Sequence, residues 1–202
     1  MHERYGTITP AIAAFAISGL LCSAQTFAQN AYIPGQLDNT VSVISTATNT
    51  ATAVINDPSF NMPDGIAVTP DGHKVYVANC VGDKVSVIHT ATNTVTTIKD
   101  PSFSEAVGVA VTPDGRTVYI SNYHGNTVSV IDSATDTVTK VIQDPSFNFP
   151  WGAVVTPDGR KVYVVNNGPM FDGNTVSVID TATNTVTETI PCRTVKAPLP
   201  WR

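Results

Sequence analysis

The side chains that are best suited to binding or catalysis lie in a few short stretches of this chain. "YHGN" (123–126) places a phenol beside an imidazole, and "NFPWG" (148–152) places two aromatic rings close together. "NGPMFDGN" (167–174) adds a thioether, a further ring and a carboxylate. Aromatic rings beside a few polar groups are typical of binding surfaces. The candidate binding residues are Tyr123, His124, Phe149, Trp151, Met170, Phe171 and Asp172.

These stretches interrupt a repeat that covers most of the chain. "VTPDGHKVYVAN" from Val68 returns as "VTPDGRTVYISN" from Val111 and as "VTPDGRKVYVVN" from Val155. Each full unit holds four short runs rich in Val, Ile, Thr and Tyr, which favour strands. In the second unit these runs, named A to D, cover residues 66–68, 75–78, 85–88 and 94–98. The sequence therefore predicts an all-β chain.

The connections between the runs carry turn signals. Thr-Pro-Asp-Gly joins run A to run B. This tetrapeptide predicts a tight turn, because proline presets φ, aspartate bonds its own backbone and glycine accepts a positive φ. The C–D connections contain Asn93, Asp136 and Asn184, which tolerate the left-handed conformation. Each unit therefore predicts a four-stranded antiparallel meander. Repeats of about 40–45 residues with four strands are typical of propeller blades, and a linear β-solenoid is the main alternative.

Run C indicates that both faces of each meander are covered. In "VSVI" the valines point to one face and the isoleucine to the other. We expect the first face to be buried against a neighbouring unit. The valines concerned are Val41, Val43, Val85, Val87, Val128, Val130, Val176 and Val178.

The repeat resembles a known family. "GIAVTPDGHKVYVAN" followed by "VSVIHTATNTVTTI" is similar to the YVTN β-propeller repeat of exported and surface-layer proteins. The tetrapeptide Tyr-Val-Thr-Asn, after which the family is named, corresponds to residues 76–79, 119–122 and 163–166, none of which has threonine at the third position. The first copy, at residues 32–35, also lacks the asparagine. The resemblance covers nearly all of residues 31–191 and implies a scaffold without shared catalytic residues. We expect a β-propeller of about four four-stranded antiparallel blades, the first incomplete because it lacks run A.

This blade number leaves the closure of the propeller open. Relatives in the family typically have about seven blades, so this chain forms a small ring of four, joins a second chain in a larger ring, or is a fragment of a longer ancestor. Residues 194–197 are a candidate substitute for the missing strand. An unclosed end exposes strand edges that invite pairing, which favours a homodimer that completes a larger ring.

The meander predicts where the candidate residues lie. The A–B and C–D connections form one edge of the blades, here called the turn edge, and carry near-identical sequences. The B–C and D–A connections form the opposite edge, here called the loop edge, and carry most of the differences between copies. All seven candidate residues belong to the loop edge. The alternative is that these loops have drifted without constraint and that Trp151 fills the central channel.

Other residues have weaker signals. Asn79, Asn122 and Asn166 end run B at equivalent points, where they either ring a channel and bind a ligand or cap the strand through backbone hydrogen bonds. Cys80 and Cys192 would form either a disulfide or two separate thiols in an oxidising compartment. No zinc-site spacing, G-x-S-x-G, H-E-x-x-H or phosphate-binding loop occurs, so we predict no catalytic residue, metal or cofactor.

The N-terminal segment and the net charge limit where the protein is expected to act and which partners it is expected to bind. Residues 1–28 have the layout of a secretory signal, with a cut after Ala24 or a retained apolar anchor as alternatives. Residues 29–191 form the repeats, and residues 192–202 form a tail. The net charge of −5 and the lack of a basic cluster exclude nucleic acid as an expected partner, and no transmembrane span is predicted in the exported part.

The expected function is that of an exported scaffold in the periplasm, at the cell surface or outside the cell. It would bind a protein, glycan or cell-envelope component through the loop edge, without catalysis. The alternative is a periplasmic enzyme, such as a lactonase-like hydrolase or a quinoprotein-type accessory, with its site at the channel mouth. A remnant without function is the third alternative. The sequence does not identify the ligand.

Overall fold

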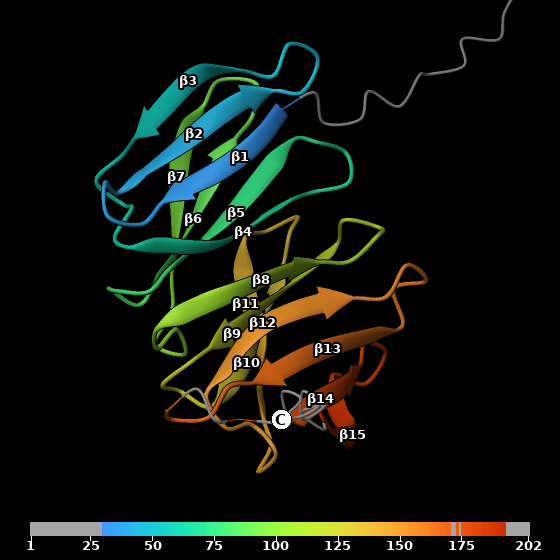
Figure 1. Cartoon of the computed structure of the whole chain (residues 1–202). Helices are drawn as coiled ribbons and strands as arrows, with labels where there is room; N and C mark the ends of the chain where they lie inside the picture. Colours follow the sequence, from blue (N-terminus) through green and yellow to red (C-terminus); the bar gives the residue numbers. More distant parts are fainter. Residues whose placement is uncertain (1–29, 171–172, 174, 193–202) are drawn as a thin grey trace, which may run out of the picture.

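The computed structural model describes residues 30–170, 173 and 175–192, and this part of the chain forms four antiparallel sheets (Figure 1). The predicted signal segment and most of the predicted tail lie outside these residues. The first sheet has three strands and the other three have four each, as the repeats predict. The fold is of the β-propeller type and has four blades, the first of which lacks strand A.

The strands follow the order A to D within every blade. The first blade contains β1 (Asn30–Gly35), β2 (Thr40–Ser45) and β3 (Thr50–Asn56). The second contains β4 (Pro63–Val68), β5 (Lys74–Asn79), β6 (Lys84–His89) and β7 (Thr94–Lys99). The third contains β8 (Ala106–Val111), β9 (Thr117–Asn122), β10 (Thr127–Asp132) and β11 (Thr137–Gln143). The fourth contains β12 (Pro150–Val155), β13 (Lys161–Asn166), β14 (Thr175–Asp180) and β15 (Thr185–Pro191).

The turn edge is built as the sequence predicts. The glycine of each Thr-Pro-Asp-Gly turn has a φ of 73° or 74°. In each of these turns the threonine hydroxyl donates to the aspartate Oδ1 over 2.6 Å. In the C–D turns, Asn93, Asp136 and Asn184 have φ values of 55°, 53° and 51°, so the predicted left-handed positions are confirmed.

The hydrophobic core lies between consecutive blades. Each seam joins the valines of strand C and a tyrosine of strand B in one blade to the apolar residues of strands A, B and C in the next. In the second blade Val85 and Val87 face the third blade, while Ile88 faces the first. Seven of the eight predicted valines are buried, and Val176 in the fourth blade is half-buried. Each fully buried valine contributes about 1.5 kcal/mol.

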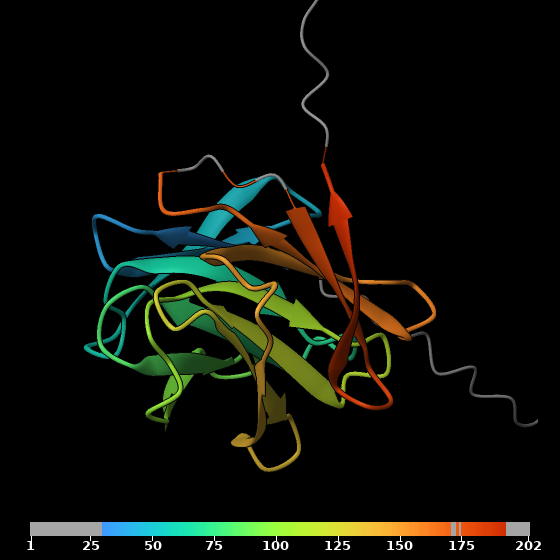
Figure 2. The same cartoon turned by 90° about the horizontal axis from the view of Figure 1, so that it is seen from below.

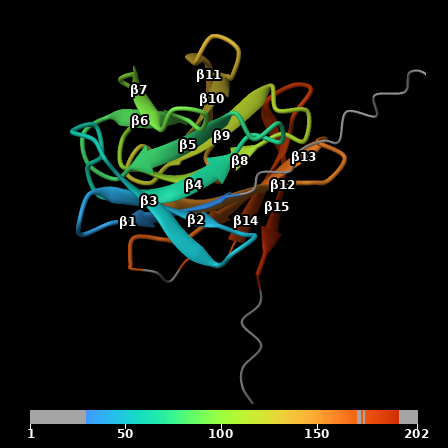
Figure 3. The same cartoon turned by 90° about the horizontal axis from the view of Figure 1, so that it is seen from above.

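The blades form an open arc. In Figure 1 the first blade lies at the top and the fourth at the bottom, with the second and third between them. Strand β1 packs on β4, β4 on β8 and β8 on β12. In the described part of the chain, no strand of the first blade packs broadly on a strand of the fourth. Figures 2 and 3, turned by 90° from Figure 1, show the strong twist of each sheet.

Candidate binding face

The loop edge is held together by the same backbone contact in each full unit. The first residue of each B–C loop donates its N–H to a carbonyl of the preceding D–A loop. The N···O distances are 3.1 Å from Cys80 to Met62, 2.9 Å from Tyr123 to Glu105 and 3.0 Å from Asn167 to Phe149. The accepting residues have left-handed φ values of 49°, 49° and 52°. One backbone frame therefore presents three different sets of side chains.

Between the third and fourth blades, this frame gathers an aromatic cluster. The ring of Tyr123 lies 5.1 Å from that of His124, 4.9 Å from that of Phe149 and 5.4 Å from that of Trp151, each time edge to face. Such pairs are worth about 0.5–1.5 kcal/mol beyond the area that they bury. Tyr123 is buried, whereas 37% of Trp151 remains exposed. The cluster therefore offers a fixed indole to solvent.

A carboxylate lies directly beside the cluster. His124 Nδ1 lies 2.7 Å from Glu105 Oε2, and both side chains are about half exposed. Protonated His124 would form an ion pair with Glu105. Since the ring of His124 also packs on Phe149 at 5.7 Å, the pair fixes Glu105 next to the aromatic surface.

A second polar group lies at the equivalent place between the first and second blades. The Cys80 thiol donates to Asp64 Oδ2 over 3.8 Å and accepts from Gln36 Nε2 over 4.0 Å. Burial raises the pKa of Asp64, and burial together with Asp64 raises the pKa of Cys80 to about 11. Cys80 is therefore a protonated thiol at neutral pH and a poor nucleophile.

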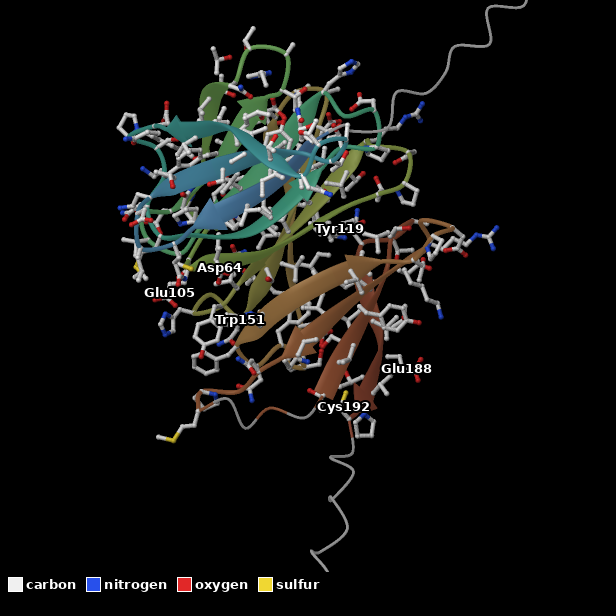
Figure 4. The ribbon with its side chains drawn as sticks, turned by 45° about the horizontal axis from the view of Figure 1, so that its top comes forward. Asp64, Glu105, Tyr119, Trp151, Glu188 and Cys192 are labelled. Carbon is white, nitrogen blue, oxygen red and sulfur yellow. The ribbon has the colours of Figure 1, made fainter. Side chains whose placement is uncertain are left out.

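Figure 4 places these groups on one side of the molecule. Asp64, Glu105 and Trp151 follow one another there, each from the D–A segment that enters a different blade. The loop edge thus carries Asp64 at one end, the aromatic rings at the other, and Glu105 between them beside the rings. Such an arrangement can bind a partner through stacking and through hydrogen bonds to carboxylates.

The other candidate residues have different surroundings. Met170 is 82% exposed. Phe171 and Asp172 lie outside the described residues. Cys80 and Cys192 are not joined in this structure, where Cys80 is half-buried and Cys192 is exposed, and the choice between a disulfide and two thiols stays a prediction. In residues 30–170, 173 and 175–192, no group of three or more His, Cys, Asp or Glu residues is placed to hold a metal.

The three asparagines lie inside the blades. Asn79, Asn122 and Asn166 are at most 1% exposed, and each donates from its amide to a strand C serine, Ser86, Ser129 or Ser177. Asn79 Oδ1 also accepts from the backbone N–H of Asn61 over 2.9 Å. These contacts favour the interpretation as strand caps over the interpretation as a channel ring.

Some residues of the face carried a weak signal or none. Glu105 belongs to the few acidic residues of the variable loops, but its pairing with His124 depends on a left-handed φ that glutamate rarely adopts. Asp64 is part of a "PDG" that resembles another turn but begins strand β4. Gln36 lies in the divergent first unit. Only the spatial approach of the loops identifies these three.

Comparisons with known proteins support the scaffold. The chain is similar to a solved structure titled "Kuenenia stuttgartiensis Hydrazine Synthase", with 26% sequence identity and a TM-score of 0.73. The match covers 81% of this chain and 46% of that one, so this chain spans less than half of its length. No family model matches the sequence, and no curated protein matches it. No helix among the described residues is long and apolar enough to cross a membrane.

Proposed function

We propose that this chain is an exported, non-catalytic β-propeller module of the YVTN type that binds a partner through its loop edge. The partner is a protein, a glycan or another component of the cell envelope. The similarity to the hydrazine synthase structure supports the scaffold of this proposal and carries no chemistry over to it.

The observation that carries the proposal is the aromatic cluster between the third and fourth blades. Tyr123 holds the ring of Trp151 edge to face, and Glu105 with its imidazole partner lies alongside. A side chain fixed in this way loses little conformational freedom when a partner binds, which makes aromatic residues effective anchors. The turn edge repeats nearly the same residues in each full unit and offers no comparable group of rings.

The proposal predicts that Trp151 senses and anchors the partner. The chain has two tryptophans, so a Trp201→Phe background leaves Trp151 as the only indole reporter. Glycan arrays and purified envelope fractions are screened for binding, and any hit is titrated by fluorescence. We expect Trp151→Ala to weaken binding at least tenfold, because buried aromatic anchors typically contribute about 2 kcal/mol or more.

A matched control distinguishes binding by the cluster from nonspecific hydrophobic binding. Leu37 is 89% exposed in the B–C loop of the first blade, on the same edge, so Leu37→Ala removes an apolar side chain without touching the cluster. Binding should survive this change. If Trp151→Ala leaves every observed interaction intact, or Trp151 emission stays constant at saturation, the loop edge is not the binding face.

The enzyme alternative has one supporting observation, the His124–Glu105 pair, which has the composition of a general base and its orienting group. A screen of lactones and esters tests it directly. Turnover that disappears in His124→Ala, with binding unaffected in Trp151→Ala, would replace the binding module with a hydrolase.

A further inference from the structure

On the outward face of strands A and B, the fourth blade exposes positions that the other full blades bury against a neighbour, although Val178 in strand C of the same face is buried. At the two outward positions of strand B, the residues of the second and third blades are at most 1% exposed. These residues are Tyr76, Ala78, Tyr119 and Ser121. The matching residues of the fourth blade are Tyr163, which is half-buried, and Val165, which is 46% exposed. In strand A, Val154 is 63% exposed where Ala110 is buried.

The glycines of strand A show the same difference between the fourth blade and the blades before it. A Cβ on Gly65 would lie 2.0 Å from the carbonyl oxygen of Val107, and one on Gly108 would lie 2.2 Å from that of Trp151. Both glycines therefore permit the next blade to approach closely. Gly152, the third of the series, has no atom within 4 Å of its Cβ position. The fourth blade keeps the glycine although no described strand approaches it.

The first blade carries the complementary face. Ile33 in β1 is 49% exposed, and Val54 in β3 is 62% exposed. At the position of Ile33, each later blade places a fully buried residue against the blade before it. These residues are Val77, Ile120 and Val164. The first blade is thus shaped to receive a preceding blade that the described chain does not provide.

A polar contact shows which partner the fourth blade fits. Tyr76 Oη donates to Asp136 Oδ1 of the following blade over 2.5 Å, and Tyr119 Oη donates to Asn184 Oδ1 over 2.7 Å. Both acceptors occupy the left-handed position of a C–D turn. The first blade has Asn49 at this position, with a φ of 54° and an exposed side chain. Tyr163 of the fourth blade therefore has its matching acceptor on the first blade of another copy.

We propose that two copies of this chain associate head to tail, with the fourth blade of each packed on the first blade of the other. The contact repeats the part of the seams within the chain that strand B and the C–D turn make, and it places the Tyr163 hydroxyl on Asn49 of the second copy. The contact of strand A with strand A has no counterpart among the described residues, because the first blade lacks strand A. Such an interface is heterologous, and two of them close into a ring when the rotation fits. Two chains of four blades give eight, within the range of about 4–8 that propellers use. The proposal does not depend on the function of the loop edge.

The oligomeric state of the purified chain tests the proposal. Light scattering coupled to size exclusion, or sedimentation velocity over a concentration series, should show a dimer. A monomer at all accessible concentrations would overturn the proposal, whatever the loop edge binds. A filament that depends on the same residues would overturn the closed ring.

Variants on the two faces test the head-to-tail arrangement. Ile33→Asp and Val165→Asp each place a charge at an exposed position of the single chain, so each variant should fold but remain monomeric. Leu37→Asp, on an exposed loop outside both faces, should dimerise normally. Tyr163→Phe should weaken the closed dimer by roughly tenfold to a hundredfold, because each of its two contacts loses one hydrogen bond. Circular dichroism and thermal melting show that each variant is folded.

Mixing the variants gives the sharpest result. Ile33→Asp chains retain an intact fourth blade, and Val165→Asp chains retain an intact first blade. The mixture should therefore form a mixed dimer through one remaining contact, while neither variant does so alone. A dimer that depends on Val165 but tolerates Ile33→Asp would show that fourth blades pair with each other, and would overturn the arrangement.

Discussion

The turn edge and the loop edge belong to the same strands, yet their side chains behave differently. On the turn edge, Thr69, Thr112 and Thr156 make the same hydrogen bond to an aspartate two residues later. On the loop edge, the backbone contact repeats while the side chains change from a thiol–carboxylate pair to an imidazole–carboxylate pair and an aromatic cluster. The repeat can therefore vary its chemistry on one edge because the other edge and the backbone maintain the blade.

The edges also differ in how they treat negative charge. The threonine hydroxyl and a backbone N–H lower the pKa of Asp71 and of Asp114 on the turn edge. Burial raises the pKa of Asp64 on the loop edge. The turn edge stabilises the charged form of Asp71 and Asp114, whereas burial destabilises the charged form of Asp64 on the loop edge. A hydrogen-bond donor or a cation placed next to Asp64 would stabilise its charged form.

The largest predicted effect tests whether the loop edge depends on close backbone packing. Gly108→Ala should reduce the free energy of unfolding by about 3 kcal/mol or more, because its Cβ would collide with the carbonyl of Trp151. Denaturant unfolding measures this. Gly152→Ala is the matched control when both variants are made in the Ile33→Asp background, which should be monomeric, since the Cβ of residue 152 then meets open space. Equal stability of the two variants would contradict the close approach of β8 and β12.

The next effect tests how the loops are anchored. Asn79→Ala should reduce the free energy of unfolding by about 1–3 kcal/mol, because it leaves the N–H of Asn61 without its acceptor and removes the amide donor of the buried Ser86, which keeps only its contact with Ser59. Asn122→Ala should cost less, because the buried Oδ1 of Asn122 has no hydrogen-bond partner in the described structure.

Thermal unfolding of both asparagine variants in the same buffer provides the comparison. The reverse order, with Asn122→Ala the more damaging, would mean that the second blade does not depend on this link between its loops.

The smallest effect tests the difference in charge between the edges. The pKa of Asp114 is lowered on folding, so its carboxylate adds stability above the unfolded value of about 3.9 and loses it as the pH falls through the folded value. Asp114→Asn should therefore lower stability by less than about 1 kcal/mol at pH 7 and flatten the acid limb of the stability profile.

The opposite sign is expected at Asp64. Its pKa is raised on folding, so the protonated form favours the fold and this advantage disappears as the pH rises through the folded value. Asp64→Asn keeps an acceptor for the Cys80 thiol and should slightly raise stability at pH 7. Unfolding curves from pH 3 to pH 8 measure both variants, and the same sign for both would contradict the difference between the edges.

The repeat predicts most of this fold because its signals are local. The Thr-Pro-Asp-Gly turns, the valines of strand C and the left-handed positions of Asn93, Asp136 and Asn184 depend on neighbours a few residues away. The same meander logic places Tyr123 and Trp151 on one edge, and the structure brings them together.

Contacts between blades were harder to predict. Tyr76 and Asp136 are 60 residues apart, and the loop pair Glu105–His124 depends on an uncommon backbone conformation. Periodicity identifies repeated structure, whereas specificity comes from residues that break it.

The open arc has a consequence for local unfolding. The second and third blades are covered on both faces, while the first and fourth are each covered on one. In a stacked repeat array, stability is approximately a sum of unit and neighbour terms, so the end blades of a single chain open first. Amide hydrogen exchange should be slowest in β5, β6, β9 and β10 and fastest in β3 and β15. The inner blades should therefore stay folded while the end blades open.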